Sequence, residues 1–524
     1  AGGAGGSAPI IDTVIVVRDN VFNEQEAQSS AAFRVMNKLH VITRPWVVRR
    51  ELLFEQGEPY DSAVVAESER NIRNLLVFRE VHIDTTHIGQ KFAVVVRTQD
   101  GWSTKPKFKF AVASDGTFIF TVGITEANLL GTANLVHISY SKDVDRSGLQ
   151  IAAQFRRFIS AKLTANGAYY ALSDGDQGNW NFGKPFRSSL SVNSLMYDGL
   201  AADRRIIQFF APDATSDPDS TFFQRTAFIN RLDGAIAAKR AATRYLRVGV
   251  TGEVREEEYL PQPNTAGTAP DSVYGQVGAY ASYTFTEFRE VRRFNGFGSE
   301  DIDLSRSIKL TANLAPGAWG YGENGIGPGI TAQGAFVYEN SFIWGSLEAN
   351  GLFSEAELDS GRVVANVAFG YKLAPRHAMA LQVQAGILDN PPPGQQFDLG
   401  FENPPRAWNP HSFVGDRTLW ATFEHRWFVW DKLLGLFGAG FAVFADYGGA
   451  WYHDIQDPRF GGNVGIGLRL GSALSTVART GRLDLAYKFG DGLSGDRWAL
   501  SFGSGFVFPI KRPMVASDPT NKPF

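Results

Sequence analysis

The sequence contains no cysteine and no long apolar run. Without cysteine, the 524-residue chain has no disulfide, no thiolate nucleophile and no thiolate metal site. No uninterrupted apolar stretch reaches the roughly 18 residues of a membrane-spanning helix, and the nearest stretch, 433–445, is broken by three glycines. The net charge of −3 gives no basic surface for nucleic acid. These absences argue against a disulfide-rich domain, a helical membrane protein and a nucleic-acid-binding protein.

Motifs of catalysis and metal binding are also missing. The eight histidines show no metal-ligand spacing such as HExxH, and neither a GxSxG elbow nor a P-loop occurs. The segment from Asp143 to Gly148 begins like a calcium loop, but its twelfth position is Gln154 instead of the glutamate that would bind the ion. The sequence therefore predicts no enzymatic activity, no cofactor and no metal site.

Glycine and aromatic residues are abundant: the chain has 55 glycines and 40 phenylalanines, yet its mean hydropathy is only −0.15. From Lys107 to Phe508, short segments alternate apolar residues with small or polar ones, and Gly, Asp, Asn and Ser separate the segments. Examples are Val363/Ala365/Val367/Phe369/Tyr371 and Val464/Ile466/Leu468/Leu470. About ten residues at roughly 3.3 Å each, tilted by about 40°, span ~25 Å of hydrocarbon. The pattern predicts an all-β transmembrane antiparallel barrel.

The alternation pattern does not determine the number of strands. We find about nineteen candidate strands, whereas a barrel whose first and last strands meet the same side of the membrane needs an even number. At least one candidate must therefore be a loop hairpin or an extension. The weakest candidates are Arg204 to Pro212 and Thr221 to Leu232, which alternate poorly. The pattern alone does not separate sixteen strands from eighteen.

Residues 9–103 are predicted to form a separate α+β domain. A flexible lead at 1–8 precedes it, the barrel covers 107–509 and a C-terminal tail covers 510–524. No signal peptide is visible, so we expect a processed chain. Within the domain we expect, in order, a β-branched strand at 10–17, a loop or short helix at 23–37, a helix at 46–54, a helix capped by Asp61, and strands at 77–84 and 92–98.

Near the C-terminus, two predicted strands each carry one carboxylate on the row opposite their apolar residues. Glu424 lies opposite the row of Leu419, Ala421, Phe423 and Trp427, and Asp446 lies opposite Phe441, Val443 and Tyr447. Inward acids in a barrel meet little water, so each needs a counter-charge. Arg406, in the preceding loop, is the obvious candidate. The alternative is that these are three unrelated solvated charges.

This arrangement resembles the bacterial surface antigen family, the BamA/TamA-type outer-membrane assembly proteins. In that family, the arginine of an R-G-aromatic fingerprint lies on a long extracellular loop that folds back into the barrel and pairs with acids of the two following strands. Arg406 matches the arginine, Trp408 the aromatic residue, and Glu424 and Asp446 the acids. Ala407 departs from the family glycine, and alanine would be strained if that position required positive φ.

Two further stretches carry the resemblance. The order of elements in residues 9–103, and its ending in TQDGWSTKP, are similar to a POTRA domain and its hand-over to the barrel. An unrelated small α+β domain is the alternative. The tripeptide from Asn128 to Leu130, followed by Gly131, resembles the family's turn after the second strand.

The resemblance implies sixteen strands, five of them after the Arg406 loop. It also implies that the first and last strands pair poorly and leave a lateral seam. In this sequence the seam residues would be Phe108, Phe110, Val112, Phe502, Gly503, Gly505 and Phe506. Glycine permits a kink in the last strand, although inward glycines can equally make room for a plug or loop.

For function, the resemblance implies a Gram-negative outer-membrane protein with its POTRA domain in the periplasm. It would assist insertion or translocation of other polypeptides through POTRA strand addition and the lateral seam. Its partners would be outer-membrane lipids, unfolded client polypeptides or a passenger protein, and other envelope proteins, but no nucleic acid. The alternative is a structural barrel or anchor of an outer-membrane complex without insertase activity. A passive pore is a third option, disfavoured if a loop fills the lumen.

Overall fold

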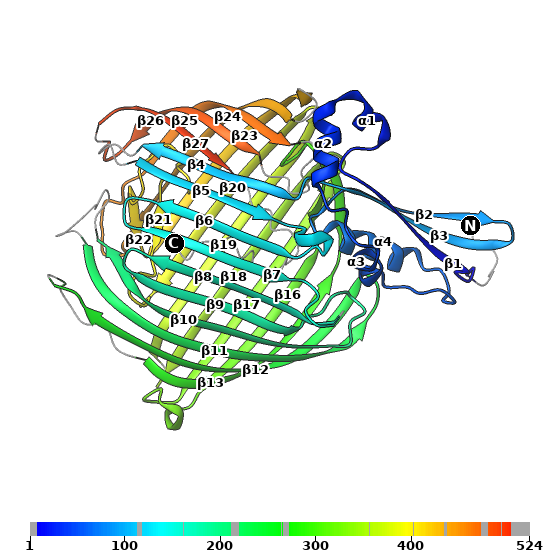
Figure 1. The fold of residues 1–524 in the computed structure, drawn as a ribbon. Coiled ribbons are helices and arrows are strands. Elements are labelled where there is room, and N and C mark those ends of the chain that lie inside the picture. Colours follow the sequence, from blue (N-terminus) through cyan, green and yellow to red (C-terminus); the bar gives the residue numbers. More distant parts are fainter. Residues whose placement is uncertain are drawn as a thin grey trace.

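The computed structural model describes residues 8–112, 118–160, 162–210, 220–263, 265, 272–355, 357–401, 403–433, 437–472, 480–493 and 495–504. A small N-terminal unit (residues 9–103) and a large barrel make up the fold (Figure 1). Within these ranges, none of the helices has the length and apolar content that crossing a bilayer requires.

The N-terminal unit is a three-stranded sheet with four helices. Its elements are β1 (Thr13–Asp19), α1 (Glu24–Ser29), α2 (Ala31–Leu39), α3 (Pro45–Glu51), α4 (Ser62–Arg73), β2 (Phe78–Ile88) and β3 (Lys91–Asp100). The strand order is β1-β3-β2, with β1 parallel to the central β3. Pro45 occupies the first turn of α3, and Asp61 Oδ1 accepts hydrogen bonds from the backbone N–H groups of Ala63 and Val64 at the start of α4.

The helices α3 and α4 provide the core of this unit. Val47 and Val48 of α3 and Ile72 of α4 are buried together with Val81 and Val96 of the sheet. The stretch 23–37, expected as a loop or one short helix, contains two helices, because Asn23 caps α1 and the hydroxyl of Ser30 caps α2.

Twenty strands of the described chain form a closed antiparallel barrel, in which the last strand pairs with the first. The strands are β4 (Thr104–Val112), β5 (Phe118–Glu126), β6 (Leu135–Lys142), β7 (Ser147–Phe155), β8 (Thr164–Leu172), β9 (Gly175–Lys184), β10 (Asn193–Phe209), β11 (Ser220–Arg240), β12 (Arg244–Pro261), β13 (Ser272–Phe285), β16 (Arg306–Ala315), β17 (Gly325–Tyr338), β18 (Ser341–Ser354), β19 (Glu357–Ala374), β20 (His377–Asp389), β23 (Arg417–Leu433), β24 (Phe437–Trp451), β25 (Gly461–Ser472), β26 (Gly481–Gly490) and β27 (Trp498–Ser504). Short 3-10 turns follow β5 (Leu129–Gly131) and β16 (Gly317–Trp319).

The barrel strands present apolar side chains outward and small or polar ones inward. In β25, Val464, Ile466 and Leu470 are exposed, whereas Asn463 and Arg469 are buried. In a closed cylinder the outward row meets lipid, and every central backbone group finds a partner in the neighbouring strand. The predicted transmembrane antiparallel barrel is therefore confirmed.

The expected number of sixteen barrel strands was wrong, because twenty strands of the described residues form the barrel. The segments judged weakest fall in β10, as far as its end at Phe209, and in β11, which are 17 and 21 residues long; residues 211 and 212 of the first segment lie outside the described residues. Since about ten residues cross the membrane, the remainder of such strands lies beyond the hydrocarbon and does not need to alternate. There, Arg204 hydrogen-bonds Gln177 and Arg205 hydrogen-bonds Asp174. The barrel also begins at Thr104 instead of residue 107.

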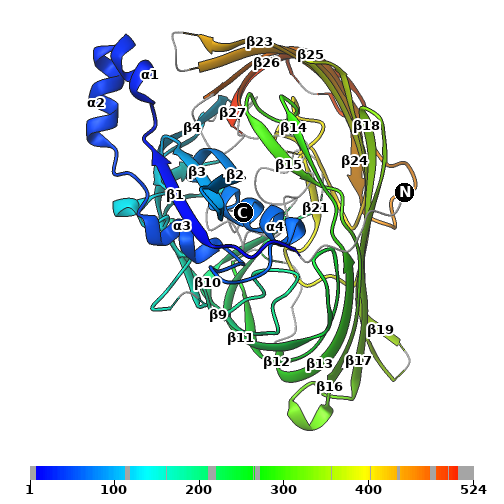
Figure 2. The same cartoon turned by 90° about the vertical axis from the view of Figure 1, so that its right-hand side faces the viewer.

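Two hairpins lie outside the strand order of the barrel. One hairpin, β14 (Phe288–Arg292) with β15 (Ser299–Asp303), connects β13 to β16. The other, β21 (Phe397–Leu399) with β22 (Phe413–Gly415), connects β20 to β23. Strands alternate in direction from β4, which leaves the N-terminal unit, so the first hairpin enters at the end near that unit and the second at the opposite end. Figure 2 shows β14 and β15 within the ring of strands.

Phe297 anchors the β14–β15 hairpin to the inner wall. Its ring is 4% exposed, and its centroid lies 5.2 Å from the ring centroid of Phe428. Gly438 and Gly471 leave the space for it, because a Cβ at Gly438 would lie 2.2 Å and one at Gly471 2.7 Å from Phe297 ring atoms. The hairpin therefore occupies a notch in the wall that two glycines create.

We predict that Phe297→Ala lowers the free energy of unfolding by about 3–5 kcal/mol, because it leaves a cavity between the hairpin and the wall. Urea unfolding in detergent micelles measures the change. Phe336→Ala is the matched control, since Phe336 is 75% exposed on the outer surface. Equal stabilities for the two variants would contradict the docking of the hairpin.

Candidate functional site

The loop between β20 and β23 folds back into the barrel and fixes Trp408 against the wall. Trp408 is buried, and its Nε1 donates a hydrogen bond to the carbonyl oxygen of Gly462 at 3.0 Å. Gly461 makes this approach possible, because a Cβ there would lie 2.4 Å from Trp408 Cζ2. Phe413, with its ring centroid 4.9 Å from that of Trp408, completes the contact.

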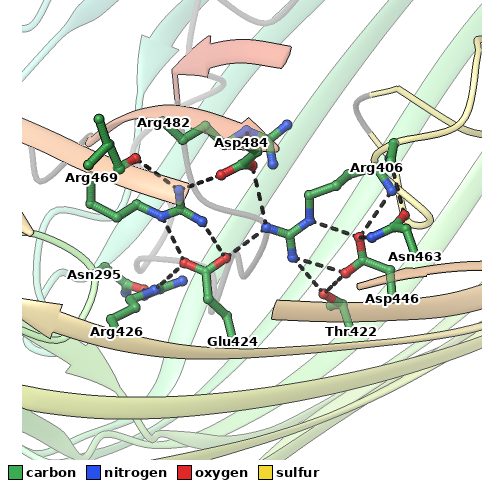
Figure 3. Close-up of polar contacts among 12 residues, drawn as sticks. Asn295, Arg406, Thr422, Glu424, Arg426, Asp446, Asn463, Arg469, Arg482 and Asp484 are labelled. Carbon is green, nitrogen blue, oxygen red and sulfur yellow. Dashed lines mark hydrogen bonds and ion pairs between the residues drawn. The ribbon is translucent and has the colours of Figure 1, made fainter. Parts of the chain in front are cut away.

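The structure brings Arg406 and Asp446 together inside the barrel (Figure 3). Arg406 Nε lies 2.8 Å from Asp446 Oδ2, and Arg406 Nη2 lies 2.9 Å from Asp446 Oδ1, which makes a two-pronged pair. The backbone N–H of Arg406 donates to the same carboxylate at 3.1 Å. Arg406 is 1% exposed, so the ion pair is shielded from water.

Glu424 and Thr422 of β23 hold the other side of the same guanidinium. Arg406 Nη1 donates to Glu424 Oε2 at 2.8 Å, and Nη2 donates to Thr422 Oγ1 at 3.0 Å. The guanidinium also lies over the ring of Phe444, 4.1 Å from its centroid. One arginine thereby joins the loop to β23 and β24.

The network contains more residues than the sequence predicted. Arg426 Nε and Arg469 Nε donate to Glu424 Oε1 at 2.8 and 3.1 Å, and Arg469 Nη1 donates to Asp484 Oδ1 at 2.6 Å. Asn463 donates to Asp446 and accepts from the backbone N–H of Ala407. These residues were missed, although the same period-two alternation places them on the inward rows of β23, β25 and β26. We refer to this set, from β23 to β26, as the Arg406 network.

Ala407 is not strained. Its backbone is not among those with positive φ, and its side chain packs beside Phe444 and Ala486. The left-handed positions nearest to it lie on either side, at Gly400 (φ 119°) and Phe401 (φ 60°) before it and at His411 (φ 61°) after it. Alanine is therefore accommodated at this position without backbone strain.

The Arg406 network continues to the hairpin that enters from the opposite end. Arg426 Nη1 donates to the carbonyl oxygen of Phe294 at 2.8 Å and to Asn295 Oδ1 at 3.1 Å. Asn295 in turn donates to Glu300, which supplies a further buried carboxylate. The two inward loops are thus joined by one run of charged hydrogen bonds across the lumen.

The same hairpin contacts the N-terminal unit. Arg73 of α4 donates to Asp301 of β15 at 3.0 Å, and the guanidinium of Arg70 lies 5.0 Å from the ring centroid of Phe288. Contacts therefore run from the N-terminal unit through the hairpin to the Arg406 loop.

A histidine fastens the Arg406 loop at the end distant from the N-terminal unit. His411 Nδ1 lies 2.6 Å from Asp398 Oδ2, and His411 Nε2 lies 3.0 Å from Asp145 Oδ2 in the β6–β7 turn. Burial lowers the pKa of His411, but hydrogen bonds to Asp145 and Asp398 and their negative charges outweigh burial and raise the pKa to about 10. The imidazole is therefore charged at neutral pH and bridges two carboxylates.

The proposed seam residues lie where the barrel closes. Between β27 and β4 the described chain pairs Ser501 with Ala111 and Phe502 with Phe110, whereas β4 and β5 are paired at nine positions. Phe110 and Phe502 stack with centroids 4.7 Å apart, and Phe108 is exposed. Val112 ends β4, while Gly505 and Phe506 lie outside the described residues.

Gly503 faces the lumen next to the Arg406 network. It is buried, and a Cβ there would lie 3.1 Å from Arg482 Nε. Gly503 thus makes room for the Arg482 side chain of β26, whose Nε lies 3.8 Å from Asp484 Oδ2. The last described strand therefore adjoins the network without a charged side chain of its own.

Chemically, the site is a set of buried ion pairs. Each carboxylate of Glu424 and Asp446 is occupied by several donors, so neither is positioned as a free acid or base. The arrangement can hold the Arg406 loop, the β14–β15 hairpin and the four strands β23 to β26 in one fixed geometry.

Comparison with known proteins gives one relative by sequence. No family model matches the chain. The outer membrane protein assembly factor BamA of Neorickettsia risticii (strain Illinois) is 24% identical over 394 residues, which cover 67% of this chain and 50% of that protein. The chain thus spans about half the length of this curated relative.

Solved structures show weaker similarity. CdiB from Escherichia coli has a TM-score of 0.47 at 10% identity, covering 96% of this chain and 91% of that one. BamA from Haemophilus ducreyi lacking POTRA domains 1–3 has a TM-score of 0.39 at 10% identity, covering 94% of this chain and 84% of that one. The sequence match to BamA and the closed antiparallel barrel relate the chain to the BamA/TamA-type assembly proteins and place it in the outer membrane of a Gram-negative bacterium.

Proposed function

We propose that the protein assists the insertion or translocation of other polypeptides at the outer membrane. The observation that carries this proposal is that, within the described residues, β27 pairs with β4 at two positions, whereas β27 pairs with β26 at seven and β4 with β5 at nine. In lipid an unpaired strand edge is costly, so a client strand that pairs with an opened edge gains the hydrogen bonds that the barrel gives up. The related BamA is named as an assembly factor.

The N-terminal unit supports a role in client binding. It is POTRA-like in its order of elements, and β2 forms one edge of its sheet. A free strand edge can accept an extended polypeptide through backbone hydrogen bonds, with little dependence on client sequence. An unfolded client would dock here before it reaches the seam.

The Arg406 network would keep the wall beside the seam in place during opening. It fixes β23 to β26, and Arg482 of β26 contacts Gly503 of the last described strand. Opening would then separate β27 from β4 without breaking the buried ion pairs.

A second candidate is a structural barrel or anchor without insertase activity. The two inward loops favour it, because the β14–β15 hairpin and the Arg406 loop enter the lumen from opposite ends and are joined by Arg426. The same filling disfavours a passive pore. That the chain lacks enzymatic activity, cofactor and metal stays a prediction.

The seam can be tested with a disulfide, because the chain has no native cysteine. Ala111→Cys with Ser501→Cys joins facing residues of β4 and β27, and Ala365→Cys with Ala385→Cys joins facing residues of β19 and β20 as the matched control. Each variant is reconstituted in liposomes, and a urea-denatured eight-stranded barrel protein is added as the client. The folding rate of the client is measured on gels of unboiled samples, in which the folded client migrates differently from the unfolded client.

We expect the reduced seam variant to accelerate client folding several-fold over empty liposomes. Oxidation should abolish the acceleration, and reduction should restore it, whereas oxidation of the control pair should have no effect. Undiminished acceleration by the locked seam would refute the seam mechanism. No acceleration by any variant would favour the anchor.

For the Arg406 network, we predict that Arg406→Ala lowers the free energy of unfolding by about 3–5 kcal/mol, because it leaves Glu424 and Asp446 buried with one partner fewer. Arg406→Lys should be intermediate, since lysine keeps the charge but cannot form the two-pronged pair. Urea unfolding in micelles measures both. Lys239→Ala, at an exposed residue, is the control; an Arg406→Ala protein as stable as this control would disprove the pairing role.

For His411, the stabilisation is fully present below its unfolded pKa of about 6.5 and is lost as pH rises to about 10. The unfolding free energy should therefore fall by up to ~1.4 kcal/mol per pH unit between about pH 7 and 9 through this group. His411→Gln should lower the free energy of unfolding at pH 6 and should remove the decrease that His411 causes between about pH 7 and 9. His87→Gln, at an exposed histidine, should change neither. A slope unchanged by His411→Gln would contradict the bridge.

A further inference from the structure

Apolar side chains of the N-terminal unit are exposed along one face of α2. Val35 is 56% and Leu39 72% exposed, and Ala31 and Ala32 continue the same face. The opposite face of the helix is occupied: Phe33 stacks on Phe22 with centroids 4.2 Å apart. Residues i and i+4 of a helix lie on one side, so Val35 and Leu39 form a contiguous apolar surface that nothing in the described chain covers.

The segment after α2 fixes this surface at the end of the barrel strands. The backbone N–H of Arg44 donates to the Gly131 carbonyl oxygen at 2.8 Å, and Asn128 Nδ2 donates to that of Val41 at 3.3 Å. Gly131 has φ +74°, and a Cβ there would lie 2.7 Å from the Ile42 carbonyl oxygen, so the contact requires glycine. The C-terminal end of α2 is thereby held at the turn between β5 and β6.

That turn borders the lipid-facing surface of the barrel. Val41 is 50% and Leu130 64% exposed, and the facing outward residues of the two strands that this turn connects, Ile124 of β5 and Ile138 of β6, are 48% and 43% exposed. The apolar face of α2 therefore extends a surface that already meets lipid.

The helix lies outside the ring of strands and not over the lumen (Figure 2). Viewed from the end of the barrel that carries the N-terminal unit, α1 and α2 lie outside the ring of strands, beside β4 (Figure 2). In both views α2 runs crosswise to the barrel, as a helix lying on a bilayer would (Figures 1 and 2). Because the bilayer surrounds a transmembrane barrel, a helix in this position is expected to meet the headgroup region.

The charges next to the apolar face suit such a surface. Arg34 and Lys38 are exposed on α2 and border the row of Val35 and Leu39. An amphipathic helix with apolar residues on one side and basic residues beside them binds the boundary of acyl chains and anionic headgroups.

We propose that α2 and the following segment to Val41 bind the periplasmic leaflet of the outer membrane as an interfacial helix, with anionic phospholipid headgroups at Arg34 and Lys38. The occupant is the lipid surface, not a second copy of the chain and not a client. This inference rests on the place of the barrel in the outer membrane and is independent of the proposed activity. It also places an interfacial helix at the turn that follows β5, the neighbour of β4 in the barrel.

Single-cysteine variants test the proposal in the full chain. Leu39→Cys is labelled with the environment-sensitive dye NBD and reconstituted in phosphatidylcholine vesicles containing 30% phosphatidylglycerol, with or without nitroxide-labelled lipid. Thr86→Cys, at an exposed position in the β2–β3 hairpin, is the matched control. NBD on Leu39→Cys should emit at a shorter wavelength than NBD on Thr86→Cys. Nitroxide-labelled lipid should quench the fluorescence of the Leu39→Cys probe several-fold more than that of the Thr86→Cys probe.

A second variant separates membrane contact from protein contact. With the dye at Ala32→Cys, the added changes Val35→Asp and Leu39→Asp should abolish the shift and the nitroxide quenching while leaving barrel unfolding unchanged. Equal quenching of the Leu39 and Thr86 probes would overturn the proposal. A blue shift without nitroxide quenching, or one that grows with the protein-to-lipid ratio, would overturn it in favour of a client or a second copy.

Discussion

The guanidinium of Arg406 between two buried carboxylates is the interaction on which the rest of the site depends. Arg406, Glu424 and Asp446 are each at most 2% exposed, so none of the three charges is stable there without the others. Their pairing brings a long loop into the lumen, and Arg426 extends the pairing to a hairpin from the opposite end. A barrel wide enough for twenty strands would otherwise enclose a large open interior. The charged network, together with Phe297 and Trp408 packed against glycines of the wall, holds the loop and the hairpin in that interior.

Period-two alternation made the barrel and the inward position of Glu424 and Asp446 predictable. It could not give the strand number, because β10, β11 and β12 extend well beyond the roughly ten residues that cross a membrane, and their outer parts follow no alternation. The β14–β15 hairpin was equally invisible. Phe297 packs in the space that Gly438 and Gly471 leave free. These glycines are distant from Phe297 in sequence, and they create this space only when the strands of the wall have assembled. The partners Arg426, Arg469 and Asp484 did lie on inward rows, but nothing in one sequence says which inward charges meet.

The position of the Arg406 network is compatible with the proposed opening of the seam. The ion pairs join β23 to β26, and the last described strand contributes only Gly503 at the edge of this set. The rigid part of the wall therefore ends one strand before the closure. Separating β27 from β4 would cost the described pairing and the stacking of Phe110 on Phe502, both on the outward side of the ion network. In the proposed mechanism, the described contacts between β27 and β4 would therefore separate without disturbing the charges that stabilise the wall.

The same reasoning applies to the N-terminal unit, which is joined to the barrel too firmly to act as a freely tethered domain. Only residues 101–103 separate β3 from β4, and they are bonded on both sides: Gly101 donates to Val77, and Ala127 of the barrel donates to Ser103. Buried Asp100 accepts from the backbone and side chain of Thr43, whose hydroxyl also accepts from Asn128. Arg73 and Asp301 add a link from inside the ring. An orientation fixed at these separate points gives the β2 edge a constant direction relative to β4, so a polypeptide bound there would always approach the barrel on the same side.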